Sequence, residues 1–133
     1  MRARLHKDDG EGRPVIYVPG IDATGDLLLG TFERLARDYR LLCVEYVADD
    51  DGDSYAGLAA SIAEIARKRG VERCLLLSES FGGAVALRTA LDFPELVAGV
   101  AVVNGFAHYG RRAALAWSRF SAPLVPAWAY RFG

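Results

Sequence analysis

Residues 74–87 read Cys-Leu-Leu-Leu-Ser-Glu-Ser-Phe-Gly-Gly-Ala-Val-Ala-Leu. The first four are apolar and indicate a buried strand, and the small residues from Gly82 favour a helix whose backbone approaches that strand closely. Ser80 lies in the tight turn between them. A serine held in this way projects its hydroxyl above the sheet, and the helix N-terminus beneath it favours negative charge. The stretch therefore predicts a strand–turn–helix unit with a candidate nucleophile at one sheet edge.

A second loop is expected at the same edge. Residues 19–25 read Pro-Gly-Ile-Asp-Ala-Thr-Gly and follow a short apolar run at 15–18. An attacked carbonyl oxygen needs two hydrogen-bond donors aimed at one point. The backbone N–H of Phe81 is one candidate, and that of Ile21 is the other. We therefore expect the two loops to converge on one crevice.

Strand and helix patterns alternate along the chain. Apolar runs predict strands at 15–18, 41–47, 72–77 and 96–103, and helical spacing predicts helices at 28–39, 55–69 and 81–91. Strands separated by amphipathic helices imply right-handed crossovers. The predicted fold class is α/β, with a doubly wound, mainly parallel sheet of about four strands.

Composition argues against several partners. The 133 residues include 16 basic and 17 acidic side chains, so the net charge is −1 and there is no basic stripe for nucleic acid. Cys43 and Cys74 lie in apolar runs and are expected to be reduced core thiols. The acidic loop at 48–53 lacks the glycine and glutamate spacing of a calcium loop, and no cysteine or histidine residues are closely paired. No metal site is predicted.

The sequence also predicts the compartment and the absence of a cofactor. The N-terminus lacks the apolar core of a signal peptide. The most apolar stretch, 113–130, contains Arg119, Pro123 and Pro126 and falls short of a membrane span. No GxGxxG or GK[ST] motif follows a predicted strand, which argues against a nucleotide site. We expect a cytoplasmic protein without a cofactor.

These motifs resemble the α/β-hydrolase superfamily from about residue 15 to residue 109. The loop at 20–25, together with Glu79-Ser80-Phe81-Gly82-Gly83, is similar to a branch of esterases, thioesterases and acyl-transfer proteins. The resemblance implies that Ser80 is the catalytic nucleophile and that the N–H groups of Ile21 and Phe81 form the oxyanion hole. It also implies that the strands lie side by side in the order 41–47, 15–18, 72–77, 96–103.

The chain departs from the family pattern at three points. Ser78 stands where the elbow commonly has its first glycine, and at most residues 3–6 represent the family's first strands. The catalytic acid and histidine of the family normally follow further strands, for which the sequence has no pattern. The resemblance therefore implies the N-terminal part of a hydrolase core over 1–110 and the start of a helical cap over 111–133.

A serine hydroxyl needs a base within hydrogen-bond reach, usually a histidine that a carboxylate orients. The chain has two histidines: His6, expected to be solvated, and His108, which follows the fourth predicted strand. Four residues are candidates to line the pocket: Asp22, Glu79, Asn104 and His108. Of these, Asp22 and Glu79 are favoured as turn and support residues.

Two functional hypotheses follow. The first is a serine acyl hydrolase of the carboxylesterase, lipase or thioesterase kind, acting on a small-molecule ester or thioester. As this chain it would be weakly active or inactive, because the acid and the histidine are lacking. The second is a non-catalytic module that binds acyl ligands or protein partners and self-associates through a sheet edge or the apolar tail.

Overall fold

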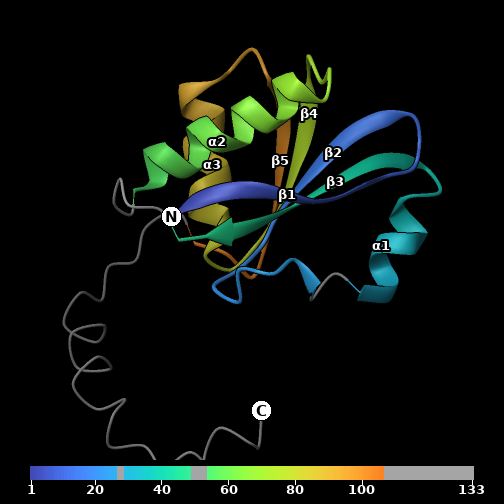
Figure 1. Cartoon of the computed structure of the whole chain (residues 1–133), viewed down its shortest axis with the longest axis horizontal. Helices are drawn as coiled ribbons and strands as arrows, with labels where there is room; N and C mark the ends of the chain where they lie inside the picture. Colours follow the sequence, from blue (N-terminus) through green and yellow to red (C-terminus); the bar gives the residue numbers. More distant parts are fainter. Residues whose placement is uncertain (27–28, 49–53, 107–133) are drawn as a thin grey trace, which may run out of the picture.

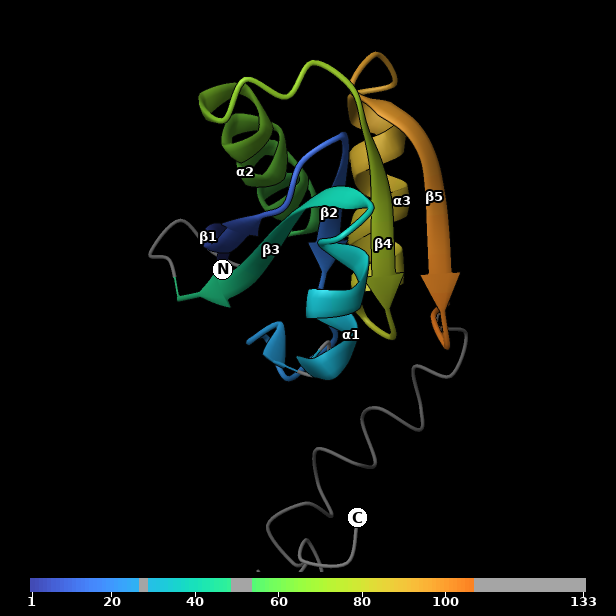
Figure 2. The same cartoon turned by 90° about the vertical axis from the view of Figure 1, so that its right-hand side faces the viewer.

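The computed structural model describes residues 1–26, 29–48 and 54–106, which build a five-stranded sheet with helices on both faces (Figures 1 and 2). The strands are β1 (Arg2–Asp9), β2 (Arg13–Val18), β3 (Tyr39–Val47), β4 (Cys74–Glu79) and β5 (Val97–Val103). The helices are α1 (Leu29–Leu35), α2 (Tyr55–Lys68) and α3 (Gly82–Asp92). Helices α2 and α3 pack on one face and α1 lies on the other, so the predicted doubly wound α/β class is confirmed.

The strands lie in the order β1-β3-β2-β4-β5. β2 pairs in parallel with both β3 and β4, and β5 pairs in parallel with β4. The order of these four strands is the one that the resemblance implied. Because the carboxyl ends of adjacent parallel strands meet at one sheet edge, the loops after β2 and β4 lie next to each other.

The sheet has five strands rather than about four, because β1 was not predicted. Its sequence, RARLHKDD, is charged at most positions, and its one fully buried side chain is that of Ala3. Pairing with β3 makes it a strand, which local apolar patterning could not indicate. Its charged side chains suit a sheet edge that faces water. Arg40, for example, donates to both carboxylate oxygens of Asp8, at 3.0 and 2.8 Å.

Helix α1 is shorter than its apolar spacing predicted. It ends at Leu35, and Tyr39, which continues the helical spacing, instead begins β3 and pairs with Arg13. Ser54 is the N-cap of helix α2, because its hydroxyl accepts the N–H of Gly57 at 3.0 Å.

Two apolar cores lie on opposite faces of the sheet. The larger joins α2 and α3 to the sheet, and the smaller lies under α1 and includes Tyr17, Phe32 and Cys43. Cys43 and Cys74 are buried free thiols, as predicted. Burial raises the pKa of Cys43 to about 12 and that of Cys74 to about 11, so neither is a nucleophile near neutral pH. Within the described residues, no helix is long and apolar enough to cross a membrane.

Candidate active site

Ser80 and Phe81 make the whole connection between β4 and α3. Ser80 has a φ of 49°, in the left-handed region that residues with a side chain rarely adopt. Its N–H donates to the carbonyl oxygen of Val103 at 3.0 Å, and its own carbonyl accepts the N–H of Gly83 at 3.0 Å. These two bonds hold the turn between β5 and α3. A strained serine between a strand and a helix is the geometry of a nucleophile elbow.

Gly82 allows α3 to approach the end of β2. A Cβ at this position would collide with the backbone oxygens of Val18 and Pro19. Ser78, at the position where the elbow commonly has a glycine, is fully buried, and its hydroxyl donates to the carbonyl oxygen of Ala101 at 3.1 Å. The serine is therefore accommodated as a polar link between β4 and β5.

The loop after β2 lies against Ser80. A Cβ added at Gly20 would lie 3.4 Å from the Cβ of Ser80. The N–H of Ala23 donates to the carbonyl oxygen of Gly20 at 3.2 Å, which closes a tight turn around Ile21 and leaves the Ile21 side chain 86% exposed. The two loops expected to converge therefore do so.

Two backbone donors beside Ser80 have no acceptor in the described part of the chain. Among the described residues, nothing accepts a hydrogen bond from the N–H of Ile21 or of Phe81. Free donors next to a strained serine suit a carbonyl oxygen that gains negative charge during attack. The N-terminus of α3, which starts one residue after Phe81, adds a favourable dipole.

Two buried tyrosines support the two loops. The hydroxyl of Tyr17 donates to Glu79 Oε2 at 3.0 Å, and that of Tyr46 donates to the carbonyl oxygen of Pro19 at 3.0 Å. Burial raises the pKa of both hydroxyls, and at Tyr17 the bond to Glu79 raises it further, so both remain donors. Neither contact was predicted, although a tyrosine within an apolar strand is a signal that its hydroxyl needs a partner. The contact gives Glu79 the supporting position that the sequence favoured.

Asp22 lies in the turn of the loop after β2. Its Oδ2 accepts the hydroxyl of Thr24 at 2.8 Å and the N–H of Thr24 at 3.4 Å. Its Oδ1 is buried, and no group among the described residues donates to it. The negative charge of Asp22 also contributes to the raised pKa of Tyr17 and Tyr46. Asp22 thus shapes the loop that presents Ile21.

Comparison with known proteins bears on this arrangement. No family model matches the sequence. RutD of Cronobacter sakazakii, a protein named as a carbamate hydrolase, is 28% identical over 114 residues, which cover 80% of this chain and 42% of RutD. A thermophilic esterase from Thermogutta terrifontis aligns over 92% of this chain and 47% of its own, with a TM-score of 0.79 and 21% identity. MGS-MChE2, an α/β hydrolase from lagoon-sediment metagenome, aligns over 90% of this chain and 59% of its own, with a TM-score of 0.71 and 21% identity. The chain has the fold of the α/β-hydrolase superfamily.

The α/β-hydrolase fold accounts for the position of Ser80 after β4 and of Ile21 after the neighbouring β2. The chain spans less than half the length of the curated relatives it matches.

No histidine lies near Ser80 in the part of the chain that the structure describes. His6 lies on β1, three strands from β4, which corresponds to about 14 Å. Its ring nitrogens face Asp26 at 3.7 Å and Glu45 at 3.9 Å. His108 lies outside the described residues, as does the expected cap at 111–133.

Asn104 is the last of the residues that the sequence predicted to line the pocket. Asn104 follows the end of β5, is exposed and has a φ of 50°. Over residues 1–26, 29–48 and 54–106, no group of histidine, cysteine or carboxylate side chains is arranged to hold a metal ion.

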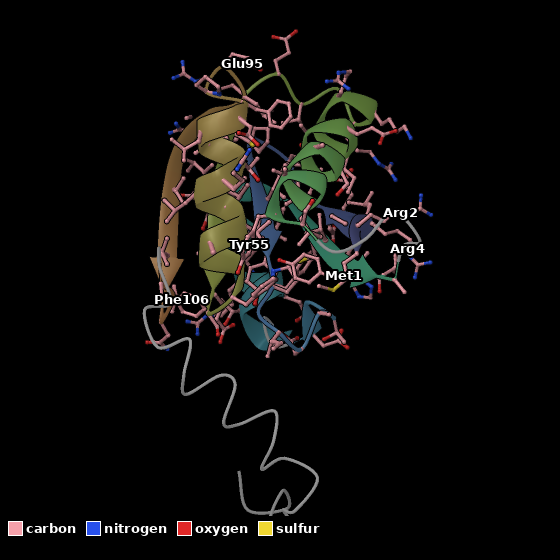
Figure 3. All side chains as sticks on the ribbon, turned by 90° about the vertical axis from the view of Figure 1, so that its left-hand side faces the viewer. Met1, Arg2, Arg4, Tyr55, Glu95 and Phe106 are labelled. Carbon is pink, nitrogen blue, oxygen red and sulfur yellow. The ribbon has the colours of Figure 1, made fainter. Side chains whose placement is uncertain are left out.

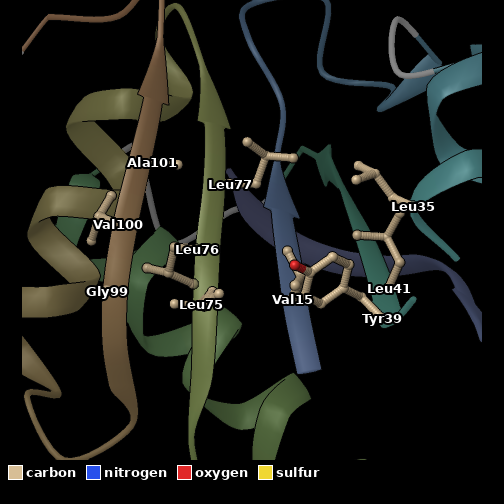
Figure 4. Close-up of a pocket in the computed structure, with 10 residues that line it drawn as sticks. All are labelled: Val15, Leu35, Tyr39, Leu41, Leu75, Leu76, Leu77, Gly99, Val100 and Ala101. Carbon is tan, nitrogen blue, oxygen red and sulfur yellow. The ribbon is translucent and has the colours of Figure 1, made fainter. Parts of the chain in front are cut away.

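An apolar groove of about 320 Å³ lies on the sheet face that carries α1, below the carboxyl edge (Figure 4). It runs between β3 and β5 and is lined by side chains such as Val15, Tyr39 and Leu75, with Gly99 at its floor. Helix α1 borders it through Leu35. Among the described residues, no other helix lies on this face, so β4 and β5 are open there.

Proposed function

We propose that the chain carries the nucleophile and the oxyanion hole of a serine acyl hydrolase that acts on carboxylic esters or thioesters. The observation that carries the proposal is Ser80 at a φ of 49°, with the free N–H groups of Ile21 and Phe81 beside it. The Ser80 oxygen would bond to the substrate carbonyl carbon while a base takes the hydroxyl proton. The carbonyl oxygen would become negative and accept both N–H groups. Loss of the alcohol or thiol would leave an acyl-serine that water hydrolyses.

The base must come from outside the described residues, because His6 is too distant from Ser80. We propose that a histidine and an acid complete the site, either through His108 or through polypeptide beyond this chain. The greater length of the relatives supports the second source. The esterase supports an acyl substrate, and the name of RutD, a carbamate hydrolase, supports a carbamate, whose carbonyl carbon bears a nitrogen.

Labelling with a fluorophosphonate tests the nucleophile directly. In a polypeptide where a histidine reaches Ser80, we expect the reagent to modify Ser80 roughly 100-fold faster than another serine of the chain, because the N–H groups of Ile21 and Phe81 stabilise the charged phosphoryl oxygen. Mass spectrometry of the digested protein locates the label. Ser61 is the internal control, since its hydroxyl on α2 donates to the carbonyl oxygen of Leu58 and accepts the N–H of Ala3. Labelling of Ser61 as fast as Ser80 would contradict the proposal.

A second candidate function is an interaction module that self-associates through its open sheet edge. Two observations favour it: the apolar groove is open, and edge strand β5 has no charged residue and exposes Val102 and Val103 by 41% and 49%. Unprotected edges of this kind pair readily with another chain.

Self-association can be measured by light scattering during size-exclusion chromatography. We expect the mass of the chain to rise toward that of a dimer with concentration, and Ala101→Lys to return it to a monomer, since Ala101 is exposed and lines the groove. Ala60→Lys, at an exposed site on α2, is the control and should change nothing. A monomer at every concentration would rule out this function.

A further inference from the structure

The ring of Phe81 contacts the rings of two tyrosines, Tyr46 and Tyr55. Its ring meets Tyr46 edge to face, with centroids 5.9 Å apart, and meets Tyr55 in a tilted stack at 5.5 Å. Tyr46 also holds the loop after β2 through Pro19. The aromatic cluster therefore links the oxyanion loop, the elbow and the start of α2.

A small cleft of about 200 Å³ opens beside this cluster, lined by Met1, Ser54, Tyr55, Leu58 and Phe81. Met1 and Tyr55 both line the cleft, and Figure 3 shows them on neighbouring parts of the molecule, well away from Glu95. Helix α2 starts at the carboxyl edge of the sheet, the edge at which Ser80 lies. Phe81 lines the cleft and directly follows Ser80, so the cleft reaches the residue that is next to the candidate nucleophile in the chain.

The lining suits a compact, largely apolar group. The described residues that line the cleft include no carboxylate or cationic side chain, their one cationic group is the α-amino group of Met1, and the hydroxyl of Ser54 accepts the N–H of Gly57. An apolar cavity of about 150 Å³ is enough for a benzene ring. A benzoyl group or a short acyl chain therefore fits, whereas a long fatty acyl chain exceeds the space.

We propose that this cleft binds the acyl group of the substrate and that Tyr55 selects compact aromatic or short aliphatic acyl groups. The inference rests on the proposed function, since it assigns the substrate class of the same site. Tyr55 is 44% exposed at the first position of α2, so its outer face can be covered by a ligand while its inner face stacks on Phe81.

The test uses ligand binding by the Ser80→Ala chain, in which no acyl transfer to residue 80 can occur. N-methylbenzamide is titrated against N-methylacetamide, and backbone amide signals are followed by NMR. We expect shifts at Tyr55, Leu58 and Phe81 and at least roughly 10-fold tighter binding of the benzamide, because its ring is removed from water. Tyr55→Ala should weaken benzamide binding by a similar factor, and Tyr55→Phe should restore it.

Tyr39→Ala is the matched control, because Tyr39 lines the separate groove on the α1 face. Benzamide shifts that gather at Tyr39 and Gly99, or affinity that Tyr55→Ala leaves unchanged, would overturn the assignment. Absence of binding while Ser80 is still labelled by a fluorophosphonate would overturn the cleft alone. Binding without selective labelling would instead contradict the proposed chemistry.

Discussion

Replacing Ser80 by alanine is expected to lower kcat for ester hydrolysis by about 10,000-fold or more in any polypeptide where a histidine reaches this serine. Ser80 would supply the attacking oxygen, and the neighbouring N–H groups of Ile21 and Phe81 cannot replace it. Initial rates with p-nitrophenyl butyrate measure the loss. The N-terminal amide signals of α3 show whether the turn is intact, because alanine must also adopt the φ of 49°.

His108→Ala locates the base. Residues that act as one unit are strongly non-additive, so a chain in which His108 is the base should lose as much activity with His108→Ala as with Ser80→Ala, and no more with both. If the base lies in other polypeptide, His108→Ala should leave the rate unchanged. Ester hydrolysis that survives Ser80→Ala in an active polypeptide would contradict the assignment of the nucleophile.

Much of the sheet could be predicted because its inner strands carry apolar side chains on both faces. Continuous apolar runs such as 41–44 and 74–77 indicate such strands without any knowledge of their neighbours. β1 could not be found in this way, since Arg2, Arg4 and Lys7 leave no apolar pattern and the strand depends on its pairing with β3. The end of α1 was predicted too late for a related reason. Tyr39 fits the apolar spacing of the helix, although it is the first residue of β3.

The candidate site could be predicted only where the residues that define it are adjacent in the sequence. Ser80 follows from its flanking residues, because a serine on a tight strand–helix turn needs a small residue two positions later, which here is Gly82. Its supports come from residues far apart in sequence: Tyr17 and Glu79 are 62 positions apart, and Pro19 and Tyr46 are 27. Such contacts depend on strand order and register, which no local pattern specifies.

Gly82→Ala is expected to destabilise the fold by about 2–4 kcal/mol. The new Cβ would meet the backbone oxygens of Val18 and Pro19, which are fixed by the sheet and cannot rotate away as a side chain could. Helix α3 would have to move from β2, and the turn at Ser80 would move with it. Urea unfolding should show a lower midpoint with an unchanged slope.

Gly70→Ala separates this collision from the general cost of losing a glycine. Gly70 has a φ of +67°, but a Cβ there would meet no atom within 4 Å. Its loss should therefore cost roughly 1–2 kcal/mol through backbone strain alone and should leave Ser80 in place. A Gly82→Ala protein as stable as Gly70→Ala, with Ser80 still labelled selectively, would mean that α3 can withdraw from β2 without disturbing the elbow. The close approach of helix and strand would then not be what holds the serine in its strained conformation.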